Sequence, residues 1–225
     1  MIYFTGDTHR HDLSRIYDGI KRFSPDDYVI VLGDFGLLWH RDFEYEYILD
    51  CLNSIGCKIL WLDGNHENHD WIDSLPVSKW HGGNIHYISH KVIHLMRGNI
   101  FDIEGKTFFV MGGAPSIDKA MRTEGISWWP REEISREESE LALTNLEKVN
   151  YKVDYILTHT CPKSIITPMF RFPEETLIKS YTEDFLDEIA PKVVCKKWLF
   201  GHWHENKQYE RYRCIYEDII DINEA

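Results

Sequence analysis

The sequence predicts an α/β fold in which two β-sheets pack together and helices lie outside them. Short runs of β-branched and aromatic residues alternate with segments that carry apolar residues at helical spacing. Alternating strands and helices are typical of a parallel sheet, whereas the closely spaced strands in the middle of the chain are typical of hairpins. At 225 residues, we expect residues 1–225 to form one domain around a sizeable core.

The first third of the chain predicts parallel strands joined by crossover helices. The expected strands are Ile2–Thr5, Tyr28–Leu32 and Lys58–Leu62, and the expected helices are Leu13–Phe23 and Phe43–Ile55. Each of the three strands ends in a polar turn that contains glycine, which is a common strand boundary.

The middle of the chain predicts antiparallel hairpins followed by a loop and a helix. The strand candidates are Ile85–Ile88, Lys91–Met96, Ile100–Ile103 and Thr107–Met111. Arg97-Gly98-Asn99 and Glu104-Gly105-Lys106 have the composition of turns between them. A loop, Gly112–Pro130, precedes a charged helix over Arg131–Val149. The glutamates of that helix are most simply a solvated face: Glu132, Glu133, Glu137, Glu138 and Glu140.

The last third returns to strands. Two are expected at Tyr155–Thr158 and Trp198–Phe200, with a helix over Glu183–Ala190 between them and closing hairpin strands within Lys207–Tyr216. The five cysteines are scattered and form no C-x-x-C pair, which disfavours a disulfide framework or a thiolate zinc site and fits the cytoplasm. We expect no signal peptide, because the chain begins directly with a strand, and no membrane span. The net charge of −12 disfavours binding to long nucleic acid.

Polar motifs follow the carboxyl ends of the predicted strands, where open α/β sheets form their ligand crevice. They are Gly6-Asp7-Thr8-His9, Gly33-Asp34, Gly64-Asn65-His66-Glu67, His159 and Gly201-His202-Trp203-His204. Together they bring two Asp, one Asn and four His (His9, His159, His202 and His204) toward one place. Such groups are costly to bury without compensation.

Metal binding explains this set of side chains. Carboxylates and imidazoles without a thiolate suit Mn, Fe, Zn or Ni, with Mn the expected ion. Seven ligands are too many for one tetrahedral site but divide over two metal ions if one carboxylate bridges. Two divalent ions about 3.5–4 Å apart are the usual arrangement for displacement at a phosphate ester.

With these motifs in this order, residues 6–204 resemble the calcineurin-like metallophosphoesterases, whose pattern is D-x-H, G-D, G-N-H-[DE], a later His and G-H-x-H. The resemblance implies a four-layer αββα sandwich of two mixed β-sheets flanked by helices. It also implies that Asp7, His9 and His204 hold one metal ion, that Asn65, His159 and His202 hold the other, and that Asp34 bridges them. His66 resembles the family histidine that contacts the phosphate and protonates the leaving oxygen.

One segment departs from the family pattern. Many members continue G-D-x-x-D-R-G, and the second Asp orients the catalytic His, whereas Leu37 stands at that position here. The Ser/Thr protein phosphatase branch is therefore disfavoured, and the group that sets the tautomer of His66 is left open. Glu67 is expected to bond neighbouring turns, and Cys161 is expected to pack. The other histidines are expected to have no role in the site: His11, His40, His69, His81, His86, His90 and His94.

The loop Gly112–Pro130 is long enough to be functional. Arg122 would suit a phosphate contact, and Trp128 and Trp129 would suit base stacking. The alternative is that the two tryptophans anchor the next helix by packing. The sequence thus predicts hydrolysis of a phosphate ester by a metal-bridging hydroxide, with a leaning toward phosphodiesters and nucleotides. A phosphomonoesterase or pyrophosphohydrolase is the alternative enzyme, and an idle protein-binding scaffold is the alternative outside enzymes.

Overall fold

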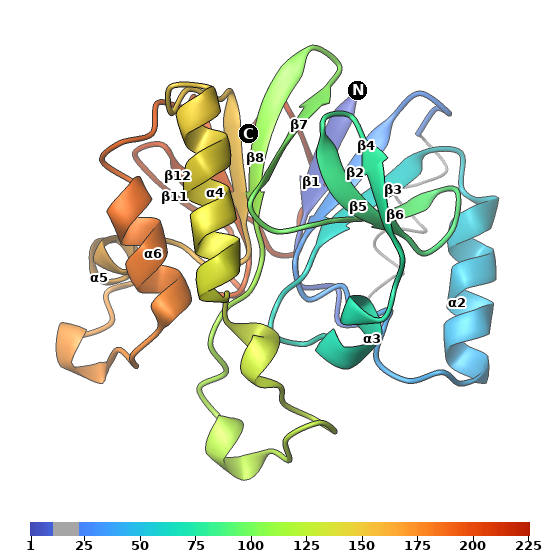
Figure 1. The fold of residues 1–225 in the computed structure, drawn as a ribbon, viewed down its shortest axis with the longest axis horizontal. Coiled ribbons are helices and arrows are strands. Elements are labelled where there is room, and N and C mark those ends of the chain that lie inside the picture. Colours follow the sequence, from blue (N-terminus) through green and yellow to red (C-terminus); the bar gives the residue numbers. More distant parts are fainter. Residues whose placement is uncertain (11–22) are drawn as a thin grey trace.

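Two mixed β-sheets pack face to face and helices cover their outer faces (Figure 1). The computed structural model describes residues 1–10 and 23–225. Helices α2 (Phe43–Ser54) and α3 (His69–Asp73) lie against one sheet. Helices α4 (Arg136–Lys148), α5 (Lys163–Phe170) and α6 (Tyr181–Ile189) lie against the other. The predicted αββα architecture is confirmed.

The first sheet has a parallel centre and antiparallel edges. Its order within the described residues is β13 (Ile220–Asp221), β1 (Ile2–Thr5), β2 (Tyr28–Leu32), β3 (Lys58–Leu62), β6 (Val92–Leu95), β5 (Gly83–Tyr87) and β4 (Val77–Trp80). β1, β2, β3 and β6 are parallel, and Phe4, Ile30, Leu60 and Ile93 are register partners across them. The predicted bounds of β1, β2 and β3 are confirmed.

The second sheet repeats this plan. Its order in the same part of the chain is β11 (Lys207–Tyr209), β12 (Tyr212–Cys214), β10 (Lys197–Phe200), β9 (Tyr155–Thr158), β8 (Lys106–Met111) and β7 (Asn99–Ile103). β12, β10, β9 and β8 are parallel, while β11 and β7 pair antiparallel at the edges. The hairpins predicted around Glu104-Gly105 and over Lys207–Tyr216 are therefore confirmed.

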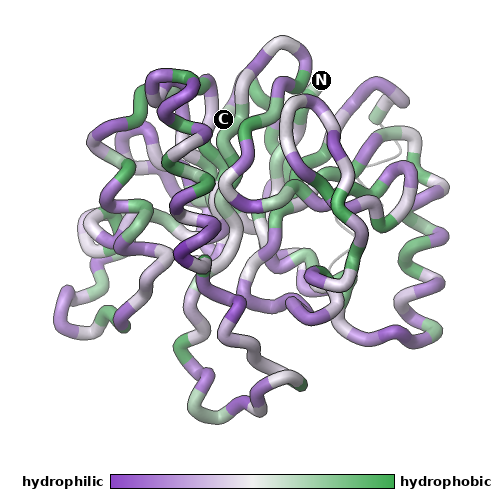
Figure 2. The backbone as a smooth tube through the Cα atoms, in the orientation of Figure 1, coloured by the Kyte–Doolittle hydropathy of each residue, from purple (hydrophilic) through white to green (hydrophobic). Residues whose placement is uncertain are grey.

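Alternating side chains build the layers of the sandwich. Ile30 of β2 and Val110 of β8 are fully buried in one cluster, which lies between the two sheets. Val31 of β2 instead joins the cluster beneath α2 and α3, and Phe109 of β8 joins the cluster beneath α4, α5 and α6. Figure 2 shows the hydrophobic residues concentrated along these interior strands. Both faces of each sheet therefore carry buried apolar side chains, and this burial fixes the register of the strands that carry the motifs.

Two predictions about the middle of the chain were wrong. Arg97-Gly98-Asn99 is not a hairpin turn, because β6 and β7 belong to different sheets and the segment crosses between them. The helix predicted from Arg131 begins only at Arg136, since Ser135 caps it and forms a capping box with Glu138.

The expected solvated face of that helix is also only partly present. Glu132 lies before the helix, in the turn η2 (Pro130–Glu132), and is 1% exposed. Glu138 binds the guanidinium groups of Arg97 and Arg131, and Glu133 accepts a hydrogen bond from the Ser180 hydroxyl. Arg97 and Ser180, the partners of Glu138 and Glu133, lie on distant elements that periodicity does not reveal.

Other elements were not predicted: α3, α5, β4 and β13. The predicted helix Leu13–Phe23 and His11 fall in residues 11–22 and so, apart from Phe23, outside the described residues. The segment 112–135, with the turn η1 (Lys119–Met121), projects beyond the lower edge of the sheets in Figure 1. No helix in the described part of the chain has the length and apolar character that a membrane span requires.

Candidate metal centre

The five motifs meet where β1, β2, β3, β9 and β10 end. Each strand stops directly before its motif or one residue short of it, as the sequence predicted. Backbone hydrogen bonds join neighbouring loops: the Asp7 N–H donates to the Gly33 carbonyl at 3.1 Å, and the Gly201 N–H donates to the His159 carbonyl at 2.9 Å. The His202 N–H donates to the Asp7 carboxylate and so links the two sheets, and the loops of both sheets form one connected surface.

Two buried carboxylates lie at the middle of this surface. Asp7 and Asp34 are each 1% exposed, and both have a left-handed backbone, with φ of 52° and 49°. Asp34 Oδ1 accepts the His66 backbone N–H at 2.7 Å, and both oxygens of Asp7 accept the His202 N–H at 3.0 Å. Strained backbone of this kind persists where the surrounding structure enforces it, and it is concentrated at functional sites.

Glycine is required where these carboxylates approach other backbone. A Cβ on Gly64 would collide with the Asp34 carboxylate and the His159 ring. A Cβ on Gly201 would collide with the Asp7 carboxylate. The glycines of the G-N-H and G-H-x-H motifs thus make room for the carboxylates.

The ligand atoms of these side chains converge. Three groups have donor atoms that all lie within 4.8 Å of one another: Asp7, His9 and His204; His9, Asp34 and His66; and Asp7, Asp34 and His159. The Nε2 atoms of His9 and His204 are 3.0 Å apart, and His159 Nε2 is 3.3 Å from Asp34 Oδ1. Asp7, His9 and Asp34 each belong to two of the three groups, so the groups overlap in one continuous cluster.

Outer hydrogen bonds aim two of the ligands at the centre. His159 Nδ1 lies 2.8 Å from the Leu32 carbonyl, which can only accept, so Nδ1 carries the proton and Nε2 offers its lone pair. The Asn65 amide donates from Nδ2 to the Ser116 hydroxyl at 3.1 Å. Asn65 Oδ1 therefore faces the centre and lies 3.1 Å from His159 Nε2.

This donor set fits two divalent metal ions. It consists of carboxylate and amide oxygens with imidazole nitrogens, the ligands preferred by Mn, Fe, Zn and Ni. In the described part of the chain, the ion-pair partners of Asp34 are the histidines His9 and His159. A cation bound between them would compensate the cost of burying the carboxylate.

Burial and charge set the protonation of the site. Burial alone would raise the pKa of Asp34, but His159 and then His66 and His9 hold it below the usual value. Burial would likewise lower the pKa of His159, but the Asp34 carboxylate raises it to about 9. Burial lowers the pKa of His9 and His66, and it lowers the pKa of His202 to about 3. Neutral imidazoles are the form that binds metal, so His9 and His202 favour the binding form, whereas a metal ion would have to displace a proton from His159.

His66 stands beside this ligand set and beside Arg122. Its ring is half-buried and lies edge-on to His9 at 5.0 Å between centroids. Arg122 Nη1 is 3.3 Å from His66 Nδ1, and Arg122 Nε forms an ion pair with Asp118 at 2.7 Å. Leu37, at the position of the family's orienting Asp, is fully buried among apolar side chains. Arg122, held by Asp118, is therefore a charged neighbour of His66, as is Asp34.

Glu67 joins two motif loops, as expected. Its Oε1 accepts the N–H of Phe35 at 2.8 Å and the N–H of Gly36 at 3.3 Å. Burial, together with Asp34, raises the pKa of Glu67 well above its usual value. Cys161 is likewise buried in the cluster beneath α4, α5 and α6, in accord with a packing role.

The family profile of the calcineurin-like phosphoesterases matches residues 1–206. The chain belongs to this family. Membership indicates metal-dependent hydrolysis of a phosphate ester. No curated protein gave a match. Among solved structures, the chain is similar to the protein of unknown function AQ665 from Aquifex aeolicus, with 16% sequence identity and a TM-score of 0.36 over 96% of this chain and 89% of that chain.

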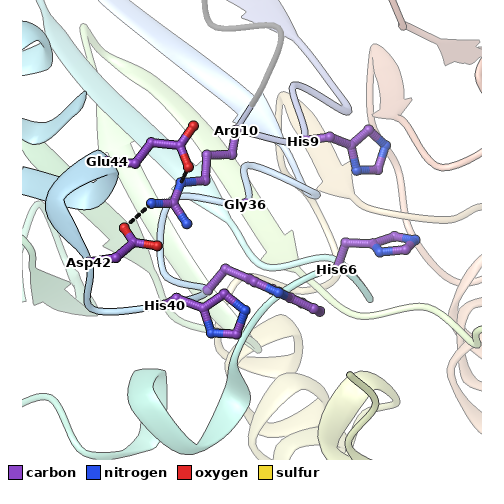
Figure 3. A pocket seen from close by; sticks show the side chains of 8 residues that line it. His9, Arg10, Gly36, His40, Asp42, Glu44 and His66 are labelled. Carbon is purple, nitrogen blue, oxygen red and sulfur yellow. Dashed lines mark hydrogen bonds and ion pairs between the residues drawn. The ribbon is translucent and has the colours of Figure 1, made fainter. Parts of the chain in front are cut away.

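Two cavities flank His66 in this phosphoesterase. The first, about 450 Å³, is lined by His9, Trp39, His40 and a buried Arg10 that pairs with Asp42 and Glu44 (Figure 3). The second, about 550 Å³, is lined by His66 together with Asn65, His202 and His204. Figure 3 shows His9 and His66 pointing together, away from the Arg10 cluster.

The structure separates the three residues predicted from the 112–130 loop. Arg122 lines the second cavity. Trp128 is half-buried beneath Lys119, whose Nζ lies 5.9 Å from the ring centroid. Trp129 is 3% exposed and donates its Nε1–H to Asp70 at 2.9 Å. The burial of Trp129 favours packing over stacking on a substrate.

Other residues that line the second cavity were not singled out from the sequence. Ser116, Phe172, Glu183 and Trp203 are among them. Of these, Trp203 had a signal, since it stands between two predicted ligands in the G-H-x-H motif. The other three carry no motif.

Proposed function

We propose that this protein is a phosphodiesterase that hydrolyses a nucleotide-type phosphodiester at a dinuclear metal centre. The observation that carries this proposal is the pair of cavities, about 450 and 550 Å³, that meet at His66. A phosphodiester carries two organic groups on one phosphorus, and each cavity can take one of them. A monoester would use only one.

The metal ligands proposed are Asp7, His9 and His204 for one ion, Asn65, His159 and His202 for the other, and Asp34 for both. Bound divalent ions, with Mn²⁺ the first candidate, would supply Lewis-acid polarisation of the phosphoryl group and activation of the attacking water. The convergence of these residues argues against an idle scaffold, which has no use for a complete ligand set.

His66 is proposed to protonate the leaving oxygen. Its ring lies next to His9 and lines both cavities, so it can reach a phosphate held at the centre. Arg122 is proposed to bind a non-bridging phosphate oxygen through Nη1, because its guanidinium lines the cavity beside His66 while Asp118 holds Nε and Nη2. Arg122 also lowers the pKa of His66, after the larger effect of burial.

The test is hydrolysis of bis(p-nitrophenyl) phosphate and of p-nitrophenyl phosphate by chelated protein, before and after addition of Mn²⁺, Fe²⁺, Zn²⁺ or Ni²⁺. We expect chelation to abolish hydrolysis, Mn²⁺ to restore it, and the diester to be the better substrate. Full activity in metal-free protein would contradict the dinuclear mechanism. A preference for the monoester would replace the diesterase assignment with a phosphomonoesterase.

A further inference from the structure

The second cavity has an apolar wall beside the metal centre. The wall is formed by Ile166 of α5, by Phe172, Leu177 and Ile178 in the segment that follows α5, and by Trp203. The cavity volume of about 550 Å³ lies within the range of small-molecule sites, about 300–1,000 Å³.

The Trp203 ring is held in a fixed orientation. It stacks on Phe170 with centroids 4.9 Å apart and an interplanar angle of 18°, and its Nε1–H donates to the Thr160 hydroxyl at 3.3 Å. Trp203 also stands in the chain between His202 and His204, two of the proposed ligands. A flat group packed against this ring is therefore next to the centre.

Phe172 extends the aromatic surface. Its side chain is 44% exposed although it is large and apolar, and its ring centroid lies 5.6 Å from that of Trp203. Exposed aromatic side chains that line a cavity are suited to stacking on a planar ring.

Glu183 supplies a polar group in the same cavity. It is 3% exposed, and Oε1 accepts the Thr160 hydroxyl at 3.2 Å. Burial raises the pKa of Glu183 to about 7, so the group is largely uncharged in mildly acidic solution. The charged pair at the cavity, Arg122 and Asp118, is mutually neutralised.

We propose that this cavity binds the nucleobase of a nucleoside phosphodiester, stacked on Trp203 and Phe172 with its polar edge toward Glu183. The inference rests on the proposed function for the position of the phosphate. An aromatic surface combined with a buried carboxyl group favours a flat heteroaromatic ring over an alkyl chain, which gains nothing from a hydrogen-bonding group. Mutual neutralisation of Arg122 and Asp118 favours an uncharged ring over a charged one.

The experiment compares ligands that differ in the group offered to the cavity. Isothermal titration calorimetry on the Mn²⁺-loaded protein measures Kd for AMP, for ribose 5-phosphate and for n-hexyl phosphate. Base stacking is expected to make AMP bind about 5- to 150-fold more tightly than ribose 5-phosphate, the equivalent of about 1–3 kcal/mol for one stacked base. Equal affinity of these two ligands would overturn the proposal. Tighter binding of n-hexyl phosphate than of AMP would assign the cavity to an alkyl group instead.

A matched pair of variants locates the effect. Phe172→Ala should reduce the preference for AMP over ribose 5-phosphate, measured as the ratio of their Kd values, at least about fivefold. Phe43 lies on α2 with its side chain 85% exposed, and Phe43→Ala should leave this ratio unchanged. Equal ratios in the two variants would contradict the assignment of Phe172. Since binding is measured without turnover, a protein that hydrolyses no ester would refute the proposed function but not the cavity. Hydrolysis of diesters without any base preference in binding would refute the cavity alone.

Discussion

The substitution His66→Ala separates proton transfer from metal binding. The variant loses the imidazole but keeps the backbone N–H that donates to Asp34 Oδ1 at 2.7 Å. The ligand loop should therefore hold its position and both metal ions should stay bound. If the main contribution of His66 is general acid catalysis, kcat should fall about 10²–10⁴-fold. This fall corresponds to a rise of about 2.7–5.5 kcal/mol in the activation free energy.

The assay is a series of aryl phosphodiesters whose leaving phenols differ in pKa. A good leaving group needs little protonation, so the loss caused by His66→Ala should shrink as the pKa of the phenol falls. Metal content by elemental analysis is measured on the same samples. His90→Ala serves as the control, because His90 is exposed and lies outside the cavities around the centre.

Two results would refute this role. A loss of the same size for every leaving group would mean that His66 positions the phosphate and transfers no proton. Loss of a metal ion would make His66 a ligand, an alternative with a structural basis because its ring shares one donor group with His9 and Asp34.

Three further predictions concern stability. Arg97→Ala should lower the free energy of unfolding, measured by urea denaturation, by about 3–5 kcal/mol. The reason is that Asp63, which is 2% exposed, loses its guanidinium partner. A change below about 1 kcal/mol would contradict the importance of this pair. Trp129→Ala should cost about 3–5 kcal/mol, because the ring is 3% exposed and bonded to Asp70; unchanged stability with an altered KM would restore the stacking role. The folded-state pKa of Glu183, about 7, lies above its ordinary value of 4.5, so protonated Glu183 stabilises the fold below pH 4.5 and this stabilisation is lost as the pH rises through 7. In the parent protein the free energy of unfolding should therefore fall by on the order of 3 kcal/mol between pH 4.5 and 7, and Glu183→Gln should abolish this fall. Identical pH profiles of the urea midpoint in the two proteins would contradict the prediction.

Four of the strands that carry the motifs could be predicted to the residue, and the fifth, β10, begins at Lys197, one residue before its predicted start. Their buried runs are short, β-branched and ended by glycine turns, so local pattern and tertiary environment agree at β1, β2 and β3. Helix α5 was missed because it contains Pro168, which ordinarily argues against a helix interior. Helix α3 is only five residues long and shows no periodicity.

The convergence of the candidate ligands could be predicted because these residues follow strands that are adjacent in the sheets. The second cavity could not, because Phe172 and Glu183 lie in segments with no motif and reach the centre only through the packing of α5 and α6. The roles of Trp128 and Trp129 could not be separated either. Adjacent tryptophans look alike in a sequence, and only the bond to Asp70 and the packing around it bury one of them.

The metal content of the Asp34→Asn and His9→Ala variants tests the dinuclear centre most directly. Elemental analysis of the Mn²⁺-loaded parent protein should give about two ions per chain. Asp34→Asn should lower the occupancy of both sites, because this carboxylate lies in donor groups with His9 and with His159. His9→Ala should mainly empty the site that it shares with Asp7 and His204. Loss of one and the same ion in both variants would contradict a bridging Asp34, and a single ion per chain in the parent protein would contradict the dinuclear centre.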